Sequence, residues 1–136
     1  MILVDTTVWI DFFGGRALPH VERLQGALET GEDLCICGIV LSEVLQGIRS
    51  DSDYNKAKEY FEDLLYIPMW RETYVRSAQL YRSLRKKRII IRKPVDCLIA
   101  AVALRNDVEV CHIDRDFDAL ARVSVLRVRR LEQPKR

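Results

Sequence analysis

Five acidic residues stand next to apolar segments of this sequence, and carboxylates in such places suit a divalent metal site. They are Asp5, Glu43, Asp96, Asp114 and Asp116. Ligands of open parallel sheets gather outside the carboxyl ends of the strands. Several carboxylates in one cleft would raise one another's pKa values unless a cation neutralised them. Magnesium and manganese prefer oxygen ligands, so the pattern indicates Mg²⁺ or Mn²⁺.

Each acid also has a simpler explanation when it is considered alone. Asp5 and Asp116 could each cap the helix that follows. Glu43 could be a solvated helix residue, and Asp96 is favoured electrostatically near a helix N-terminus. The expected convergence of these residues on one edge of a sheet favours the metal site over four separate explanations.

Strands alternate with helices along the chain. We predict strands at residues 2–5, 34–37, 108–113 and 125–128. We predict helices at residues 7–13, 19–31 and 38–48, from the turn at 50–53 through Leu65, at 71–87, from Pro94 through 104, and around Phe117 and Leu120. The segment 89–91 is too short to assign. Such alternation predicts a three-layer α/β/α fold with a central parallel sheet of four to five strands.

Length and composition limit the class of protein. The 136 residues are 49% hydrophobic and 31% charged, which predicts one globular domain over residues 1–136, with a loose tail at 133–136. No apolar run approaches the roughly 20 residues of a membrane span, and no signal peptide is evident, so we expect a cytoplasmic protein with no membrane partner. The net charge of +2 is too small to indicate a nucleic-acid partner by itself.

The four cysteines do not form a zinc motif. They are Cys35, Cys37, Cys97 and Cys111, and no CxxC pair occurs. A structural zinc site would need four ligands at suitable spacing. We therefore expect four buried, reduced thiols.

Several motifs together resemble the PIN-domain ribonucleases, and more narrowly the VapC-type toxins of toxin–antitoxin modules. The segments that carry the resemblance are ILVDTTVWIDFF, GIVLSEVLQGI and PVDCLIAAVALRNDVEVCHIDRDF, in that order. The resemblance extends over nearly the whole chain. It implies a metal-dependent endoribonuclease that hydrolyses RNA phosphodiester bonds, forms homodimers and is inhibited by a small VapB-type antitoxin. Its substrate would be tRNA or rRNA.

The resemblance also implies a role for each acid. Asp5, Glu43, Asp96 and Asp114 would form the catalytic set. The metal would be bound by Asp5, Asp96 and Asp114, with Asp116 as a further ligand, since families of this type differ in which acid of the last loop reaches the metal.

Candidate substrate-binding residues lie close to these acids in the sequence. Thr6 and Thr7 follow the first acid, and a basic run precedes Asp96. The basic residues are Arg85, Lys86, Lys87, Arg88 and Arg92, and Lys93 adjoins them. They could bind RNA phosphates or form a solvated helix end. His20 and His112 could instead support metal-free acid–base cleavage, but neither lies in a supporting motif, and we assign no role to His112.

Three other functions can be weighed against this one. A housekeeping RNA-processing nuclease with the same fold would have the same acids, and only a neighbouring antitoxin gene would separate it from a toxin. A non-catalytic binding module is disfavoured because the acids are intact. A receiver domain would need an acid pair after the first strand, where Thr6 and Thr7 stand.

Overall fold

Five short parallel strands form the centre of the fold, in the order β3-β2-β1-β4-β5. The computed structural model describes residues 1–131, and the expected tail at 133–136 lies outside the described residues. The strands are β1 (Ile2–Val4), β2 (Leu34–Cys37), β3 (Leu65–Ile67), β4 (Glu109–His112) and β5 (Val128–Arg130). Five parallel strands confirm the predicted sheet.

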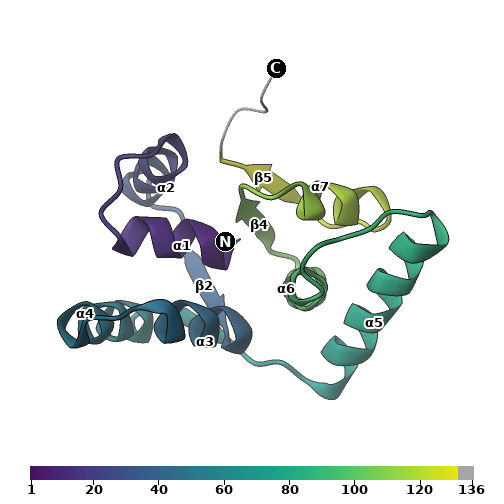
Figure 1. Ribbon diagram of the computed structural model, residues 1–136, viewed down its shortest axis with the longest axis horizontal. Coiled ribbons are helices and arrows are strands. Elements are labelled where there is room, and N and C mark those ends of the chain that lie inside the picture. The colour runs from purple at the N-terminus through teal and green to yellow at the C-terminus, as the bar shows by residue number, and fades with distance from the viewer. Residues whose placement is uncertain (132–136) are drawn as a thin grey trace.

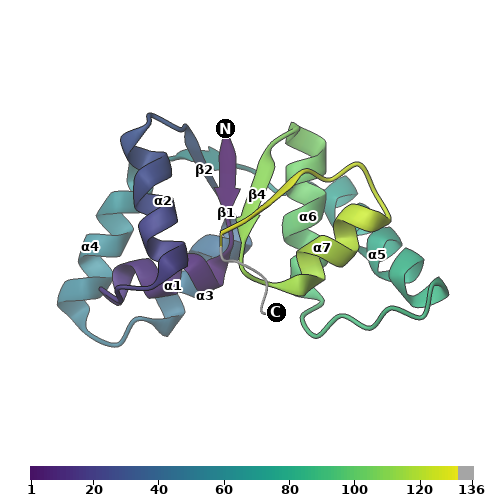
Figure 2. The same ribbon diagram turned by 90° about the horizontal axis from the view of Figure 1, so that it is seen from above.

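Helices cover both faces of this sheet. They are α1 (Thr6–Phe13), α2 (Pro19–Glu29), α3 (Gly38–Gly47), α4 (Asp51–Glu62), α5 (Arg71–Lys86), α6 (Val95–Asn106) and α7 (Arg115–Arg122). In both views, α1 to α4 gather on one side of the strands and α5 to α7 on the other (Figures 1 and 2). The predicted α/β/α sandwich is therefore confirmed.

Local sequence signals explain where two of the helices begin. Pro19 occupies the first turn of α2, where its missing N–H has no helical partner to lose. The hydroxyl of Ser50 accepts a hydrogen bond from the N–H of Asp53 and caps α4. Helix α6 is apolar on nearly all sides, and its middle residues from 99 to 103 are all buried. The sequence therefore predicts α6 as a central helix that packs against several neighbours.

Two predicted boundaries are wrong. Residues 65–67 form the edge strand β3 and do not continue the preceding helix, because α4 ends at Glu62 and the chain then pairs with β2. The last strand begins at Val128, not at 125, because Ser124 and Leu126 form a local turn after α7. The unassigned segment 89–91 has no regular structure.

The strand order places a topological switch point between β1 and β4. The chain moves from β1 outward through β2 to β3, then returns to add β4 on the other side of β1. The N–H of Asp5 donates to the carbonyl of Cys111, so the ends of β1 and β4 lie side by side. Crevices at such points are where ligands bind in open α/β sheets.

The core is continuous through the sheet and its helices. Trp9, Leu24, Ile36, Ile99 and Phe117 are among its fully buried side chains. All four cysteines are buried and free, which confirms the expectation of reduced thiols. Within residues 1–131, the structure contains no helix long and apolar enough to cross a bilayer.

Candidate functional site

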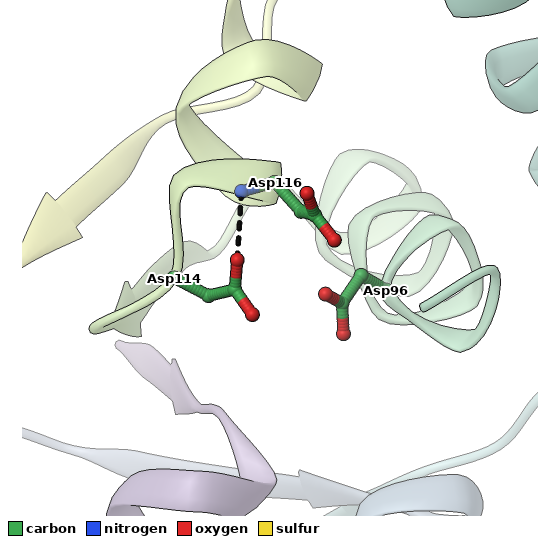
Figure 3. Close-up of side chains that lie close together, drawn as sticks. All are labelled: Asp96, Asp114 and Asp116. Carbon is green, nitrogen blue, oxygen red and sulfur yellow. Dashed lines mark hydrogen bonds between the residues drawn. The ribbon is translucent and has the colours of Figure 1, made fainter. Parts of the chain in front are cut away.

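Three aspartates from two helices meet at the switch point. Asp96 lies in the first turn of α6, Asp114 is the N-cap residue of α7, and Asp116 lies in the first turn of α7. One carboxylate oxygen from each lies within 4.8 Å of the others, and Figure 3 shows the side chains facing a common space. The segment that begins α7 thus brings two acids to the one on α6.

Asp5 approaches this group from the end of β1. Its side chain is 1% exposed, and its Oδ2 atom has no hydrogen-bond partner among the described residues. Burial raises the pKa of Asp5 to about 6, against the opposing effect of the nearby Lys93 ammonium. Although Asp5 occupies the N-cap position of α1, its side chain makes no capping hydrogen bond. The simpler explanation of Asp5 as a helix cap therefore fails.

Asp96 has the most strongly perturbed carboxyl of the site. It is 1% exposed, and its Oδ2 atom also has no hydrogen-bond partner within the described part of the chain. Burial raises the pKa of Asp96 to about 8, and the charge of Asp5 acts in the same direction. Asp5 and Asp96 are thus two buried carboxyls that resist ionisation, and each has an oxygen without a hydrogen-bond partner among the described residues. A bound cation would stabilise their ionised forms.

Asp114 differs from these two acids because it is already stabilised as an anion. Burial opposes its ionisation, but the N–H of Asp116 and the Lys93 ammonium outweigh burial, so the pKa of Asp114 is lowered. The Asp116 N–H donates to Oδ1 at 2.9 Å, and Lys93 Nζ lies 3.1 Å from Oδ2. Asp114 is therefore ionised more easily than Asp5 or Asp96.

Asp116 connects the two helices that carry the acids. Its Oδ2 atom accepts hydrogen bonds from the backbone N–H groups of Arg92 and Lys93, at 3.1 and 3.4 Å. The helix cap expected at Asp116 is supplied by Asp114 instead. Asp116 therefore holds the segment before α6 and also contributes to the acidic group.

Glu43 is held beside the site by a threonine. The hydroxyl of Thr6 donates to Glu43 Oε1 at 2.8 Å, across the contact between α1 and α3. Glu43 also adds to the negative potential at Asp5. The structure thus brings Glu43 near the first acid, as the sequence indicates, and Thr6 acts on Glu43 through its hydroxyl. Thr7 is half-buried on α1.

The basic residues divide into two groups. Arg92 lies at the site, because its N–H binds Asp116 and its charge helps to lower the pKa of Asp114. The basic cluster 85–88 is exposed at the end of α5. Arg85 lines a groove between α5 and α6 together with Pro94 and Val95, which immediately precede Asp96 in the sequence. The hydrogen bonds and ion pairs within residues 1–131 do not join the cluster 85–88 to the acids.

The sequence placed Lys93 in the basic run before Asp96 but did not predict its contacts with the acids. Its ammonium contacts Asp114, its N–H reaches Asp116, and its carbonyl accepts the N–H of Asp96 at 2.9 Å. Burial opposes the charge of Lys93, but the surrounding aspartates raise its pKa overall. The available signal was a lysine three residues before an acid at the start of an apolar helix.

The two histidines lie apart from each other. His20 is buried beside Asp11, with Nε2 2.7 Å from Oδ2. His112 is fully buried at the end of β4, where burial lowers its pKa. These different surroundings offer no pair for metal-free acid–base cleavage.

The donor set fits a hard divalent cation. It consists of carboxylate oxygens, two of which are buried and unpartnered, without a cysteine or histidine ligand in the cluster. Such donors favour Mg²⁺ or Mn²⁺ over softer metals.

Comparisons with known proteins agree with this fold. The family model for the PIN domain matches residues 2–123. Ribonuclease VapC11 of Mycobacterium tuberculosis (strain ATCC 25618 / H37Rv) is 32% identical over 130 residues, which are 93% of this chain and 96% of VapC11. Ribonuclease VapC18 of the same strain is 30% identical over 124 residues, 89% of this chain and 88% of VapC18.

Solved structures show the same fold. VapBC2 from Rickettsia felis, bound to a DNA fragment from its promoter, has a TM-score of 0.74 at 18% identity and covers 96% of this chain and 98% of its own. DNA-bound VapBC from Salmonella typhimurium also has a TM-score of 0.74, at 19% identity, and covers 96% of this chain and 97% of its own.

The fold is that of a PIN domain. The chain belongs to the PIN-domain family and, within it, to the VapC ribonucleases. The family match covers residues 2–123, and a single domain over residues 1–136 stays a prediction.

Proposed function

We propose that this protein is a Mg²⁺- or Mn²⁺-dependent endoribonuclease that acts as the toxin of a type II toxin–antitoxin system. The observation that carries the proposal is the convergence of Asp5, Asp96, Asp114 and Asp116 at the switch point, with buried unpartnered oxygens on two of them. The VapC ribonucleases similar to this chain support the reaction class.

Asp5, Asp96 and Asp114 are the proposed metal ligands, and Asp116 contributes from the same loop as Asp114. When bound, the ion would polarise the phosphodiester, lower the pKa of the attacking water and stabilise developing negative charge. Asp114 supplies a carboxylate that is already ionised, whereas Asp96, whose pKa is raised to about 8, would release a proton when the ion binds near neutral pH.

Two further residues of the site have proposed roles beside the acids. Glu43, held by the Thr6 hydroxyl, is placed to orient water next to Asp5. Lys93 carries the positive charge nearest to the acids, so its ammonium can contact a phosphate oxygen of the substrate as well as Asp114.

RNA is the proposed substrate, in the form of a tRNA or rRNA. Arg92 lies at the site, and the basic cluster 85–88 lies at the end of the groove between α5 and α6. Cations placed in this way attract a polyanion through counterion release. A similar fold occurs in VapC20 of M. tuberculosis, described as a sarcin–ricin loop cleaving toxin, at 17% identity.

The proposed protein partners are a VapB-type antitoxin and a second copy of this chain. Complexes named VapBC are among the solved structures with this fold. The homodimer rests on the resemblance to VapC-type toxins, and the proposed location is the cytoplasm.

RNA cleavage by the purified protein tests the proposal. Cleavage should require Mg²⁺ or Mn²⁺ and stop in excess EDTA. Asp96→Asn should lower the rate by about 10³-fold or more while the protein stays folded, because an anionic ligand of the metal is lost. Asp33→Asn, at an exposed acid away from the cluster, is the matched control and should keep full activity. Full cleavage in EDTA, or by the Asp96→Asn protein, would contradict the metal mechanism.

Growth of a bacterial host separates a toxin from a housekeeping nuclease. Expression of the wild-type chain without an antitoxin should slow growth, and the Asp96→Asn substitution should relieve the effect. Normal growth with an abundant, active enzyme would favour the housekeeping function.

A further inference from the structure

The fully buried imidazole of His112 contacts the loop that carries two of the acids. His112 ends β4, and its Nδ1 atom accepts a hydrogen bond from the backbone N–H of Asp114 at 3.0 Å. Nδ1 must be unprotonated to accept this bond, so the proton of the neutral ring belongs on Nε2. Nε2 lies 3.3 Å from Asp118 Oδ1. The two nitrogens of one ring therefore face the start of the acidic loop and the helix that follows it.

The ring is held from several sides. The backbone carbonyl of His112 accepts the N–H of Leu131, which ties the end of β4 to the chain after β5. The ring of Phe117 lies 5.2 Å away, between centroids, at an interplanar angle of 47°. Asp118 is in turn held by Arg130 Nη1 at 2.6 Å. An acceptor fixed in this way can determine where the Asp114 backbone lies.

The position of the Asp114 backbone decides the direction of both loop acids. Asp114 Oδ1 accepts the N–H of Asp116, which leaves Oδ2 directed to Lys93 and the acidic group. Asp116 follows within the same turn, and its Oδ2 atom reaches back to Arg92 and Lys93. A shift of the Asp114 N–H would therefore move two carboxylates of the site together.

We propose that His112 is a positioning residue for the metal: its Nδ1 atom fixes the loop backbone through the Asp114 N–H and so presents Asp114 and Asp116 to the ion. This inference rests on the proposed function, because it requires the acids to bind a metal. His112 itself does not reach the metal or the substrate. Its effect is that of the outer groups around metal sites, which orient the direct ligands.

Mn²⁺ binding by matched variants tests the inference without measuring activity. In His112→Asn, the amide oxygen replaces Nδ1 as the acceptor for the Asp114 N–H. In His112→Gln, the amide lies near the place of Nε2, and in His112→Leu no acceptor remains. Free Mn²⁺ measured by electron paramagnetic resonance should give a dissociation constant for His112→Asn within about threefold of wild type. His112→Gln and His112→Leu should bind about tenfold more weakly or worse.

Thermal unfolding of each metal-free variant supplies the control for a purely structural role. A structural role would make Mn²⁺ affinity follow stability, whichever side chain is present. Wild-type affinity in folded His112→Gln and His112→Leu would overturn the inference, and so would equal losses in all three variants. If the wild type itself bound no Mn²⁺, the proposed metal site would fail first, and the inference with it.

The wild-type protein supplies a second test that does not depend on the folding of a variant. The ¹⁵N spectrum of His112 should show an unprotonated Nδ1 and a protonated Nε2 near neutral pH. The opposite tautomer would overturn the inference, because a protonated Nδ1 cannot accept the Asp114 N–H.

Discussion

Replacing Asp5 by Asn should stabilise the metal-free protein at neutral pH while it weakens metal binding. Asp5 is 1% exposed, and burial raises its pKa from 3.8 to about 6. A shift of one pKa unit corresponds to about 1.4 kcal/mol of free energy. The buried carboxyl therefore costs the native state about 3 kcal/mol of unfolding free energy above pH 6, relative to an acid that titrates normally.

The sign of the pH dependence follows from the direction of the shift. The native state holds the Asp5 proton more tightly than the unfolded state, so the contribution to stability is greatest below pH 3.8. It is lost progressively as pH rises to about 6 and stays lost at higher pH. Asn cannot ionise, so the variant avoids this loss. The charge of Asp5 also helps to raise the pKa of Asp96, so removing it acts in the same direction.

Urea unfolding in EDTA at pH 4 and pH 7 measures this effect. Asp5→Asn should be close to wild type at pH 4 and more stable by roughly 1 to 3 kcal/mol at pH 7. The exposed Asp33→Asn variant is the control for a general loss of one negative charge, and it should show no comparable gain. An equal gain for Asp5→Asn at both pH values, or no gain at pH 7, would refute the reasoning from burial.

Mn²⁺ should reverse the order of stability. A ligand at 1,000 times its dissociation constant stabilises the native state by about 4.1 kcal/mol, which exceeds the expected advantage of the variant. The wild type should gain this amount, and Asp5→Asn should gain much less because it lacks one anionic ligand. A variant that keeps its advantage in saturating Mn²⁺, with no loss of affinity, would show that Asp5 does not bind the metal.

Three further predictions concern neighbouring groups. Thr6→Val should lower the free energy of unfolding, measured in urea, by about 1 to 3 kcal/mol, because Glu43 loses its hydrogen bond. Thr6→Ser keeps the hydroxyl and should lower the free energy of unfolding by less. Equal losses in the two variants would contradict this. Lys93→Gln should tighten Mn²⁺ binding by about fivefold in calorimetry, because a cation beside the acids is removed, and weaker binding would count against it. Replacing the basic cluster 85–88 by Gln in the Asp5→Asn protein should weaken the salt dependence of RNA binding. The slope of log affinity against log salt concentration should become shallower by roughly 2 to 3, at about 0.7 per lost phosphate contact. An unchanged slope would mean that the cluster is only a solvated helix end.

The sequence predicted the general fold because its signals are local. Apolar runs of strand length alternate with helical periodicity, and Pro19, Gly38 and Ser50 mark where helices begin. The edge strand β3 escaped prediction because Leu65 and Tyr66 are exposed, so its apolar residues read as the end of the preceding helix. Its pairing with β2 supplies the backbone hydrogen bonds that no local signal reveals.

The acids of the site could be named from the sequence, since Asp5, Asp96 and Asp114 each lie at the end of an element. Their meeting was decided by the tertiary structure, through the return of the chain that sets β4 beside β1. The role of Lys93 was hidden for the same reason, because its contacts join α6 to a loop some twenty residues further along the chain. Element ends follow from short-range propensity, whereas burial, the raised pKa of Asp96 and its charged neighbours depend on which distant segments fold together.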